Sequence, residues 1–556
     1  MEVPSFNKCI QKSIQDNWDL DALSDYGQKT FQYKDVARII EKLHIIFEAS
    51  GVQKGDKVAI CGRNSARWGI AFLSTLTYGA VAVPILHEFH PEQIHDIVNH
   101  SDAKLLFVGD QVWPKLDAEK MPGLEGIFGN SSDEYRLLYG RTDKVRYARE
   151  NLNRLFGERF PMNFRKHHID YYKDNPEEMA VLNYTSGTTS NSKGVMIPYR
   201  ALWSNVTFAD EVYHDHVQKG SNVVSILPTA HMYGMAFEFL YEMTCGAHVH
   251  FLGKTPSPTV LLKAFEELKP KVVIAVPLLI EKIVRKAIFP KIKAPAIRLA
   301  LMTPLLRDRI RLNIRRRMQK AFGDNFFEII VGGAAINKDI EVFLKGIGFN
   351  YTVGYGATEC APIICYAPWN KFKQGSCGKA APRMEVVIDS PDPQHVPGEI
   401  LARGMNVMLG YYKNPEATAE TLRDGWYHTG DLGVMDAEGN VFIKGRSKNM
   451  LLGANGQNIY PEEIEDKLSS LPYVTECVVI QKNEQLYGLV YADPDEVKKG
   501  GLTQAQLEEQ MELNRTELNK IVPTYARVAG IKLMPEEFEK TPKKSIRRYK
   551  YMNYPV

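Results

Sequence analysis

A twelve-residue segment rich in hydroxyl side chains, residues 184–195, has the composition of a phosphate-binding loop. It contains two glycines, one lysine and seven hydroxyl groups. Glycine allows the backbone to approach a ligand closely, amide and hydroxyl groups donate to phosphate oxygens, and Lys193 supplies positive charge. A polar surface turn is the alternative. The order Ser192-Lys193-Gly194 differs from the G-x-x-x-x-G-K-[ST] loop, so the pattern disfavours a P-loop ATPase.

Short apolar runs that alternate with amphipathic stretches predict the elements that would hold this loop. We expect strands at residues 58–61, 80–85, 105–108, 223–227, 272–276 and 328–331. We expect helices at residues 67–78, 91–100, 257–268 and 339–346. This alternation predicts α/β layers with mainly parallel sheets. Residues 110–176 are predicted to form surface helices and loops, and a smaller α/β unit is predicted from about residue 446.

Composition limits the class of protein. The 556 residues carry a net charge of +3, which argues against a nucleic-acid binder, and the chain is long enough to bury a core without disulfides or metal. The seven cysteines are scattered and form no C-x-x-C pair, which is typical of free thiols in a reducing cytoplasm. We also expect neither a secretory signal nor a membrane-spanning helix.

The loop resembles the signature of adenylate-forming enzymes, a family of acyl-CoA synthetases, peptide-synthetase adenylation domains and firefly-type luciferases. Several other blocks along the chain share this resemblance. The family loop usually reads YTSGTTGxPKG, whereas Ser190 and Ser192 stand here for Gly and Pro. The other family-like blocks are GDKVAI at 55–60, LPTAHMYG at 227–234, VGGAA at 331–335, GYGATE at 354–359, GWYHTGDL at 425–432 and GRSK at 445–448. The resemblance runs from about residue 28 to 548 and is nearest to the long-chain acyl-CoA synthetase branch.

The resemblance implies a two-domain α/β fold and a two-step reaction. Residues 1–445 would form a large domain of layered α/β subdomains, and residues 446–556 a small mobile α+β domain with its hinge near Lys448. The first step would join a carboxylic acid to ATP, with Mg²⁺, to give an acyl-adenylate and pyrophosphate. The second would transfer the acyl group to coenzyme A.

The resemblance also assigns roles to individual residues. Those at the phosphates are Thr185, Ser186, Gly187, Thr188, Thr189 and Lys193, with Thr185 and Glu359 as Mg²⁺ ligands. Those at the adenosine are Gly332, Gly333, Ala334, Tyr355, Gly356, Thr358, Asp431 and Arg446, with Tyr355 as a stacking face and Asp431 accepting from the ribose hydroxyls. His231 would lie beside the acyl-adenylate, a buried structural histidine being the alternative, and Gly456 would line the pantetheine tunnel. Thr185, His231, Glu359 and Lys544 would be the catalytic set.

One position departs from the family pattern. The family's adenylation lysine falls on Ser545 in an ungapped match, with Lys544 one residue earlier and Lys543 two. We expect Lys544 to replace it. The alternative is a nucleotide-binding homologue whose catalysis is weakened or lost.

The residues near the acyl pocket favour an apolar acid. Met232 stands where amino-acid-activating relatives have an Asp, so the ammonium of an amino acid would lack a counter-ion. We expect a medium- or long-chain fatty acid, with an aryl acid next. Coenzyme A is the expected acceptor and an acyl carrier protein the alternative. A basic stretch at 306–318 is predicted to be a solvated helix face or to contact an anionic inner membrane face or an acidic carrier.

Overall fold

The computed structural model describes residues 3–130, 135–185, 192–253, 258–285, 289, 303–452, 458–541 and 545–556. Its largest sheet has the order β20-β9-β8-β4-β3-β5-β6-β7 and is parallel from β8 to β6. Its strands are β3 (Lys57–Gly62), β4 (Val81–Leu86), β5 (Ala103–Val108), β6 (Gly126–Gly129), β7 (Leu137–Gly140), β8 (Met179–Tyr184), β9 (Gly194–Pro198) and β20 (Gly410–Tyr411).

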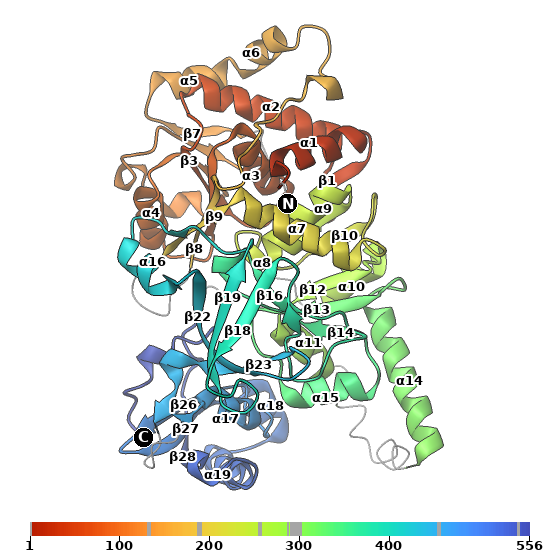
Figure 1. Ribbon diagram of the computed structural model, residues 1–556, viewed down its shortest axis with the longest axis vertical. Coiled ribbons are helices and arrows are strands. Elements are labelled where there is room, and N and C mark those ends of the chain that lie inside the picture. The colour runs from red at the N-terminus through yellow and green to blue at the C-terminus, as the bar shows by residue number, and fades with distance from the viewer. Residues whose placement is uncertain are drawn as a thin grey trace.

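Helices surround this sheet: α3 contacts β3 and β4 directly, whereas α1 and α6 pack on α2. In Figure 1 they form the upper half of the molecule around the N-terminus. They are α1 (Phe6–Asp16), α2 (Tyr33–Ala49), α3 (Ala66–Tyr78), α4 (Pro91–His100), α5 (Asp143–Glu150), α6 (Leu152–Arg159) and α7 (Tyr199–Tyr213). The apolar side chains of α3 from Ala66 to Leu76 are completely buried, and Trp68 and Phe72 pack against Phe239.

Two smaller sheets follow; in Figure 1, β1 and β10 are at the height of the main sheet, whereas β12, β13 and β14 lie lower. One has the order β10-β11-β1-β2, from β10 (Asn222–Ser225), β11 (His248–Phe251), β1 (Asp21–Asp25) and β2 (Thr30–Gln32). The parallel sheet β12-β13-β14 is formed by β12 (Val272–Ala275), β13 (Glu328–Val331) and β14 (Tyr351–Val353). The helices with them are α8 (Met232–Met235), α9 (Tyr241–Cys245), α10 (Pro258–Leu268), α11 (Pro277–Ile283), α14 (Pro304–Ala321) and α15 (Lys338–Gly346).

Antiparallel strands connect this body to the C-terminal part. They are β15 (Tyr355–Gly356), β16 (Ile363–Tyr366), β17 (Lys379–Ala380), β18 (Met384–Asp389), β19 (Gly398–Gly404), β21 (Leu422–Arg423), β22 (Trp426–Met435) and β23 (Val441–Arg446), with α16 (Pro415–Thr421) beside them. The long strand β22 alternates buried and half-buried side chains, so Tyr427, Thr429 and Asp431 all point inward.

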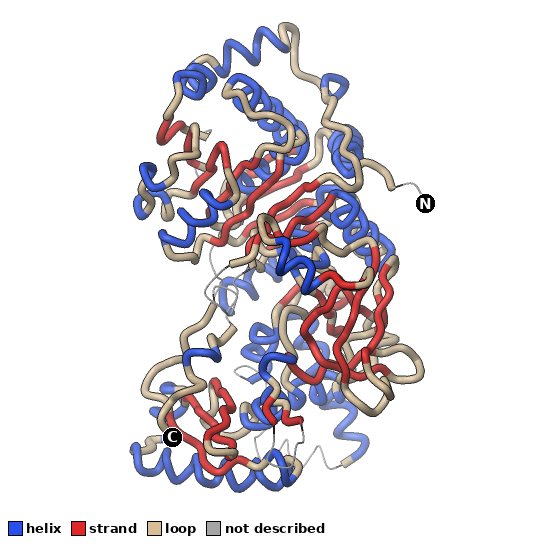
Figure 2. Tube along the Cα trace, turned by 60° about the vertical axis from the view of Figure 1, so that its left-hand side comes forward, coloured by secondary structure: helices blue, strands red, loops and turns tan. Residues whose placement is uncertain are grey.

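The C-terminal residues have hydrophobic clusters of their own, around Leu468 and Val490 and around Phe538. The elements are β24 (Leu451–Leu452), β25 (Asn458–Ile459), α17 (Pro461–Leu468), β26 (Glu476–Lys482), β27 (Gln485–Tyr491), α18 (Pro494–Gly500), α19 (Gln504–Ile521) and β28 (Val528–Leu533). Figure 2 shows them as a separate group at the lower end. The boundary at residue 446 and the hinge at Lys448, which lies exposed in the 3-10 turn Ser447–Asn449, stay predictions.

Most of the predicted elements are present, with two informative differences. The strand predicted at 223–227 ends at Ser225, because the amides of Ile226 and Leu227 donate to the Glu238 carboxylate. The stretch 110–176 was expected to hold helices and loops only, but β6 and β7 extend the main sheet there. These strands have four residues each, too few to show a period in the sequence.

Candidate functional site

The phosphate loop is the connection of a β-hairpin. Strands β8 and β9 pair antiparallel up to Tyr184 and Gly194, and the Thr185 amide donates to the Lys193 carbonyl at 3.0 Å. The hairpin therefore fixes Thr185 and Lys193 side by side at the base of the loop. The predicted phosphate residues Ser186, Gly187, Thr188 and Thr189 lie outside the described residues.

Tyr411 joins the base of this loop to Glu359. The Lys193 ammonium lies 4.7 Å from the centre of the Tyr411 ring, and the Tyr411 hydroxyl donates to Glu359 Oε1 at 2.9 Å. Burial and the nearby Glu359 raise the pKa of Tyr411, so the phenol stays protonated and remains a donor. Sequence reasoning missed Tyr411. Its position follows from the pairing of β20 with β9, which places Tyr411 opposite Val195.

Three predicted nucleotide residues meet at the start of the C-terminal part. Asp431 and Arg446 are directly opposite in the β22–β23 pair, and Arg446 Nε lies 2.8 Å from Asp431 Oδ1. The Tyr355 hydroxyl donates to Asp431 Oδ2 at 2.5 Å. Burial raises the pKa of Asp431, whereas Arg446 and the Tyr355 hydroxyl lower it. The sequence placed all three at the adenosine but did not predict the bond between Tyr355 and Asp431.

The glycines predicted to lie beside the adenine are needed for different structural reasons. Gly333 has a φ of +84°, which favours glycine, and it and Ala334 are exposed at the end of β13. A Cβ on Gly332 would lie 3.0 Å from the Tyr233 ring. A Cβ on Gly356 would lie 2.2 Å from the Pro362 carbonyl oxygen, so only glycine fits there. Thr358 begins the short turn Thr358–Cys360 that carries Glu359.

His231 caps the short helix α8, and its Nδ1 accepts a hydrogen bond from the Tyr233 amide at 3.3 Å. The segment before it is held by Asn64, which accepts from the Thr229 amide at 2.9 Å and donates to the Leu227 carbonyl at 2.6 Å. Tyr233 donates to the Ile330 carbonyl at 3.0 Å. This bond links the His231 segment to β13, and so to the adenine-side glycines.

The buried carboxyl group of Glu238 also holds the segment that precedes His231. It accepts from the Ile226 and Leu227 amides at 3.0 and 2.9 Å and lies in the π-helical turn Ala236–Leu240. Burial raises its pKa well above the usual value. Sequence reasoning missed Glu238, although an acid inside the apolar run 235–241 is a usable signal. Met232 and Met235, expected near the acyl chain, are completely buried in the core.

Two more of the predicted functional residues, Gly456 and Lys544, fall outside the described residues, as does the alternative Lys543. Of the residues on either side of Lys544, the Thr541 amide donates to the Ser545 carbonyl at 2.8 Å. Ser545 is exposed. Lys540, the other lysine of this segment, pairs with Glu476 and Glu537.

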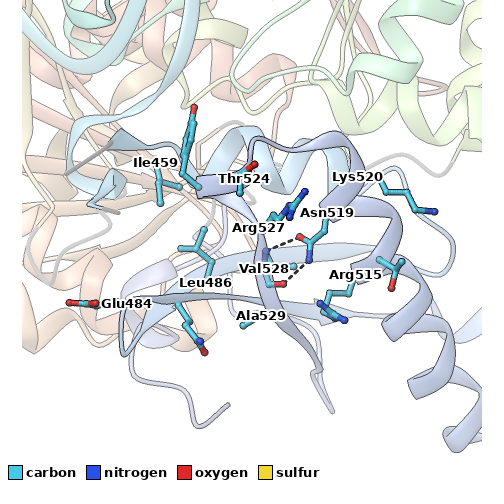
Figure 3. Close-up of a pocket in the computed structure, with 13 residues that line it drawn as sticks. Ile459, Glu484, Leu486, Arg515, Asn519, Lys520, Thr524, Arg527, Val528 and Ala529 are labelled. Carbon is cyan, nitrogen blue, oxygen red and sulfur yellow. Dashed lines mark hydrogen bonds between the residues drawn. The ribbon is translucent and has the colours of Figure 1, made fainter. Parts of the chain in front are cut away.

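A cavity of about 660 Å³ lies in the C-terminal part, and none of its lining residues is a predicted site residue. Figure 3 shows that it opens between α19 and the β27–β28 strands, where Asn519 bonds to both backbone groups of Val528. Two of its cations, Arg515 and Lys520, pair with Glu512 and Glu517. The residues predicted to bind the nucleotide therefore lie elsewhere, on β8–β9, β13, β15 and β22–β23 and in the turns beside them.

The model of the AMP-binding enzyme family matches residues 10–412, which include the hairpin, the His231 segment and the Glu359 turn. The chain belongs to the AMP-binding enzyme family. It is 28% identical over 499 residues to a long-chain-fatty-acid–CoA ligase of Bacillus subtilis (strain 168), covering 86% of this chain and 83% of that protein.

Solved structures of AMP-binding enzymes confirm the predicted fold. The anthranilate CoA ligase AuaEII with anthranoyl-AMP has a TM-score of 0.77 at 19% identity, covering 99% of this chain and 97% of that one. ATP-bound MatB from Rhodopseudomonas palustris has a TM-score of 0.75 at 19% identity, covering 99% of both chains. Together with the family match, the sequence relatives support an adenylate-forming acid–CoA ligase.

Proposed function

We propose that this AMP-binding enzyme activates a medium- or long-chain fatty acid with ATP and transfers the acyl group to coenzyme A. The acid would attack the α-phosphorus of ATP and expel pyrophosphate, and the thiol would then displace AMP. The observation that carries the proposal is the contact of Lys193 and Glu359 through Tyr411. It joins a cation and a carboxylate beside the hairpin loop, as a reaction between two anions requires.

The oxygen groups at this point fit a magnesium ion. Glu359 Oε1 accepts one bond from Tyr411, and an ionised carboxylate has about four acceptor sites. We propose that Glu359 and the Thr185 hydroxyl hold Mg²⁺, which neutralises phosphate charge when bound. Lys193 would hold the phosphates from the hairpin side, and Asp431 with Arg446 would hold the ribose, with the Tyr355 ring against the adenine.

An apolar acid is supported by the side chains around His231. Met232, Met235 and Phe237 are buried, and none of them could pair with an ammonium group. The relative from Bacillus subtilis is named a long-chain-fatty-acid–CoA ligase, whereas AuaEII acts on anthranilate, so an aryl acid is the second candidate. All seven cysteines are described as free thiols, which supports a reducing cytoplasmic location.

The second step would use the C-terminal residues. We propose that they rotate at Lys448 between the two half-reactions, bringing Lys544 to the α-phosphate for the first and Gly456 to the thiol for the second. Lys540 is a poor substitute for Lys544, because it is engaged with Glu476 and Glu537.

Purified protein incubated with Mg-ATP and a panel of fatty and aryl acids, with and without coenzyme A, tests the proposal. Pyrophosphate and acyl-CoA are measured together. Lys193→Gln should abolish both products, while Lys12→Gln, an exposed control with the same charge change, should not affect them. Pyrophosphate without acyl-CoA would indicate another acceptor, such as an acyl carrier protein. Neither product, with ATP still bound, would favour the non-catalytic homologue that Ser545 suggests.

A further inference from the structure

The long helix α14 (Pro304–Ala321), at the edge of the molecule in Figure 1, carries a charge that the nucleotide site does not use. Its sequence contains seven Arg and Lys residues and a single acid, Asp308. The whole chain has a net charge of only +3. The net charge of the helix therefore exceeds that of the whole chain, and the remaining residues together have a net negative charge.

The helix has two distinct faces. Ile314 and Met318, one turn apart, pack with Phe322 in the hydrophobic cluster beneath the helix. The opposite side is exposed and carries four cations, one acid and three other residues: Arg309, Arg316, Arg317, Lys320, Asp308, Leu306, Leu312 and Asn313. The apolar face thus already has its partner in the core, whereas the basic face points away from the protein.

The exposed cations are not neutralised by the described part of the chain. Arg307 Nε lies 3.4 Å from its neighbour Asp308, and Arg315 donates to the amide oxygen of Asn350 at 3.3 Å. Among the described residues, no ion pair involves Arg309, Arg316 or Arg317. A surface that concentrates like charge in this way repels itself unless an anion covers it.

We propose that the basic face of α14 docks this protein on an anionic phospholipid surface. A helix of 18 residues extends for about 27 Å, so its cations can meet many phosphate headgroups at once. Leu306 and Leu312 are 46% and 44% exposed on the same face and can enter the interface between the charges.

None of the described helices is long and apolar enough to cross a bilayer, and docking by α14 would be a peripheral contact. An acidic carrier protein is the other anionic partner to consider. The two leucines among the cations favour lipid, because a bilayer accepts apolar and basic side chains along the whole helix. The inference goes beyond the proposed function and does not require it to be correct.

Co-sedimentation with vesicles tests the docking surface without ATP or acid. The full-length protein is mixed with phosphatidylcholine vesicles, with or without phosphatidylglycerol. The triple variant R309Q/R316Q/R317Q should bind the anionic vesicles roughly 100-fold more weakly, since each cation near such a surface contributes about fivefold. The control K498Q/K499Q/K532Q removes three exposed cations from the C-terminal part and should bind like the wild type. Unchanged thermal unfolding shows that both variants are folded.

Three results would overturn the inference: no binding of the wild type to anionic vesicles, equal binding to neutral vesicles, or equal losses in both triple variants. Binding of an acyl carrier protein that is lost in R309Q/R316Q/R317Q, without vesicle binding, would assign the face to a carrier instead. Acyl-CoA formation measured in detergent-free buffer separates this test from that of the proposed function. Because α14 lies outside the proposed nucleotide site, both variants should still form acyl-CoA.

Discussion

The hydroxyl group of Tyr355 should contribute more to stability than the more conspicuous ion pair between Arg446 and Asp431. Tyr355 and Asp431 are only 8% and 6% exposed, and their 2.5 Å hydrogen bond has a carboxylate as its acceptor. Such a bond contributes about 1.5–3 kcal/mol, and its loss leaves a buried oxygen without its donor. The Arg446 side chain is 60% exposed, so water screens its contact with Asp431 and can replace it. Exposed pairs contribute at most about 1 kcal/mol.

Urea unfolding of Tyr355→Phe and Arg446→Gln measures both effects. We expect the free energy of unfolding to fall by about 1.5–3 kcal/mol for Tyr355→Phe and by less than about 1 kcal/mol for Arg446→Gln. Tyr525→Phe, at a tyrosine that is 48% exposed, is the matched control and should change little. If Arg446→Gln proves the more destabilising, or Tyr355→Phe resembles the control, the reasoning from burial is wrong. The Phe ring should also preserve more of the ATP affinity than Tyr355→Ala.

Three further predictions concern other parts of the protein. Burial raises the pKa of Glu242 to about 8, so the folded state retains a proton that the unfolded chain loses near pH 4.3. The free energy of unfolding should therefore fall as the pH rises from about 5 to 8. Measured by urea unfolding, this free energy should depend less steeply on pH in Glu242→Gln than in the wild type. Gly356→Ala should lower both thermal stability and pyrophosphate release, because its Cβ would lie 2.2 Å from a carbonyl oxygen, whereas Gly157→Ala on α6 has open space and should do neither. Lys544→Ala should abolish pyrophosphate release while ATP binding, measured by calorimetry, persists; unchanged release would rule out Lys544 as the adenylation lysine.

The sequence predicted the α/β fold and the strands β3, β4, β5, β10, β12 and β13, because buried parallel strands are continuous apolar runs that periodicity detects. The expected helices at 67–78 and 91–100 are α3 and α4 with almost unchanged limits. The same method failed for β6 and β7, whose four residues each gain their order from pairing with β5 and with one another. Pairing of distant strands is a tertiary interaction, and no local pattern contains it.

The amino-acid sequence by itself determined which residue types are present for phosphate, ribose and acyl chemistry. Only the tertiary structure decided their partners: that Tyr411 lies between Lys193 and Glu359, and that the Tyr355 hydroxyl is bonded to Asp431. These contacts join residues that are far apart in the chain: Tyr411 is 52 residues from Glu359 and more than 200 from Lys193. The reason is physical. Residue type fixes charge and hydrogen-bonding capacity, whereas burial and distance, which set pKa and bond strength, exist only once the chain has folded.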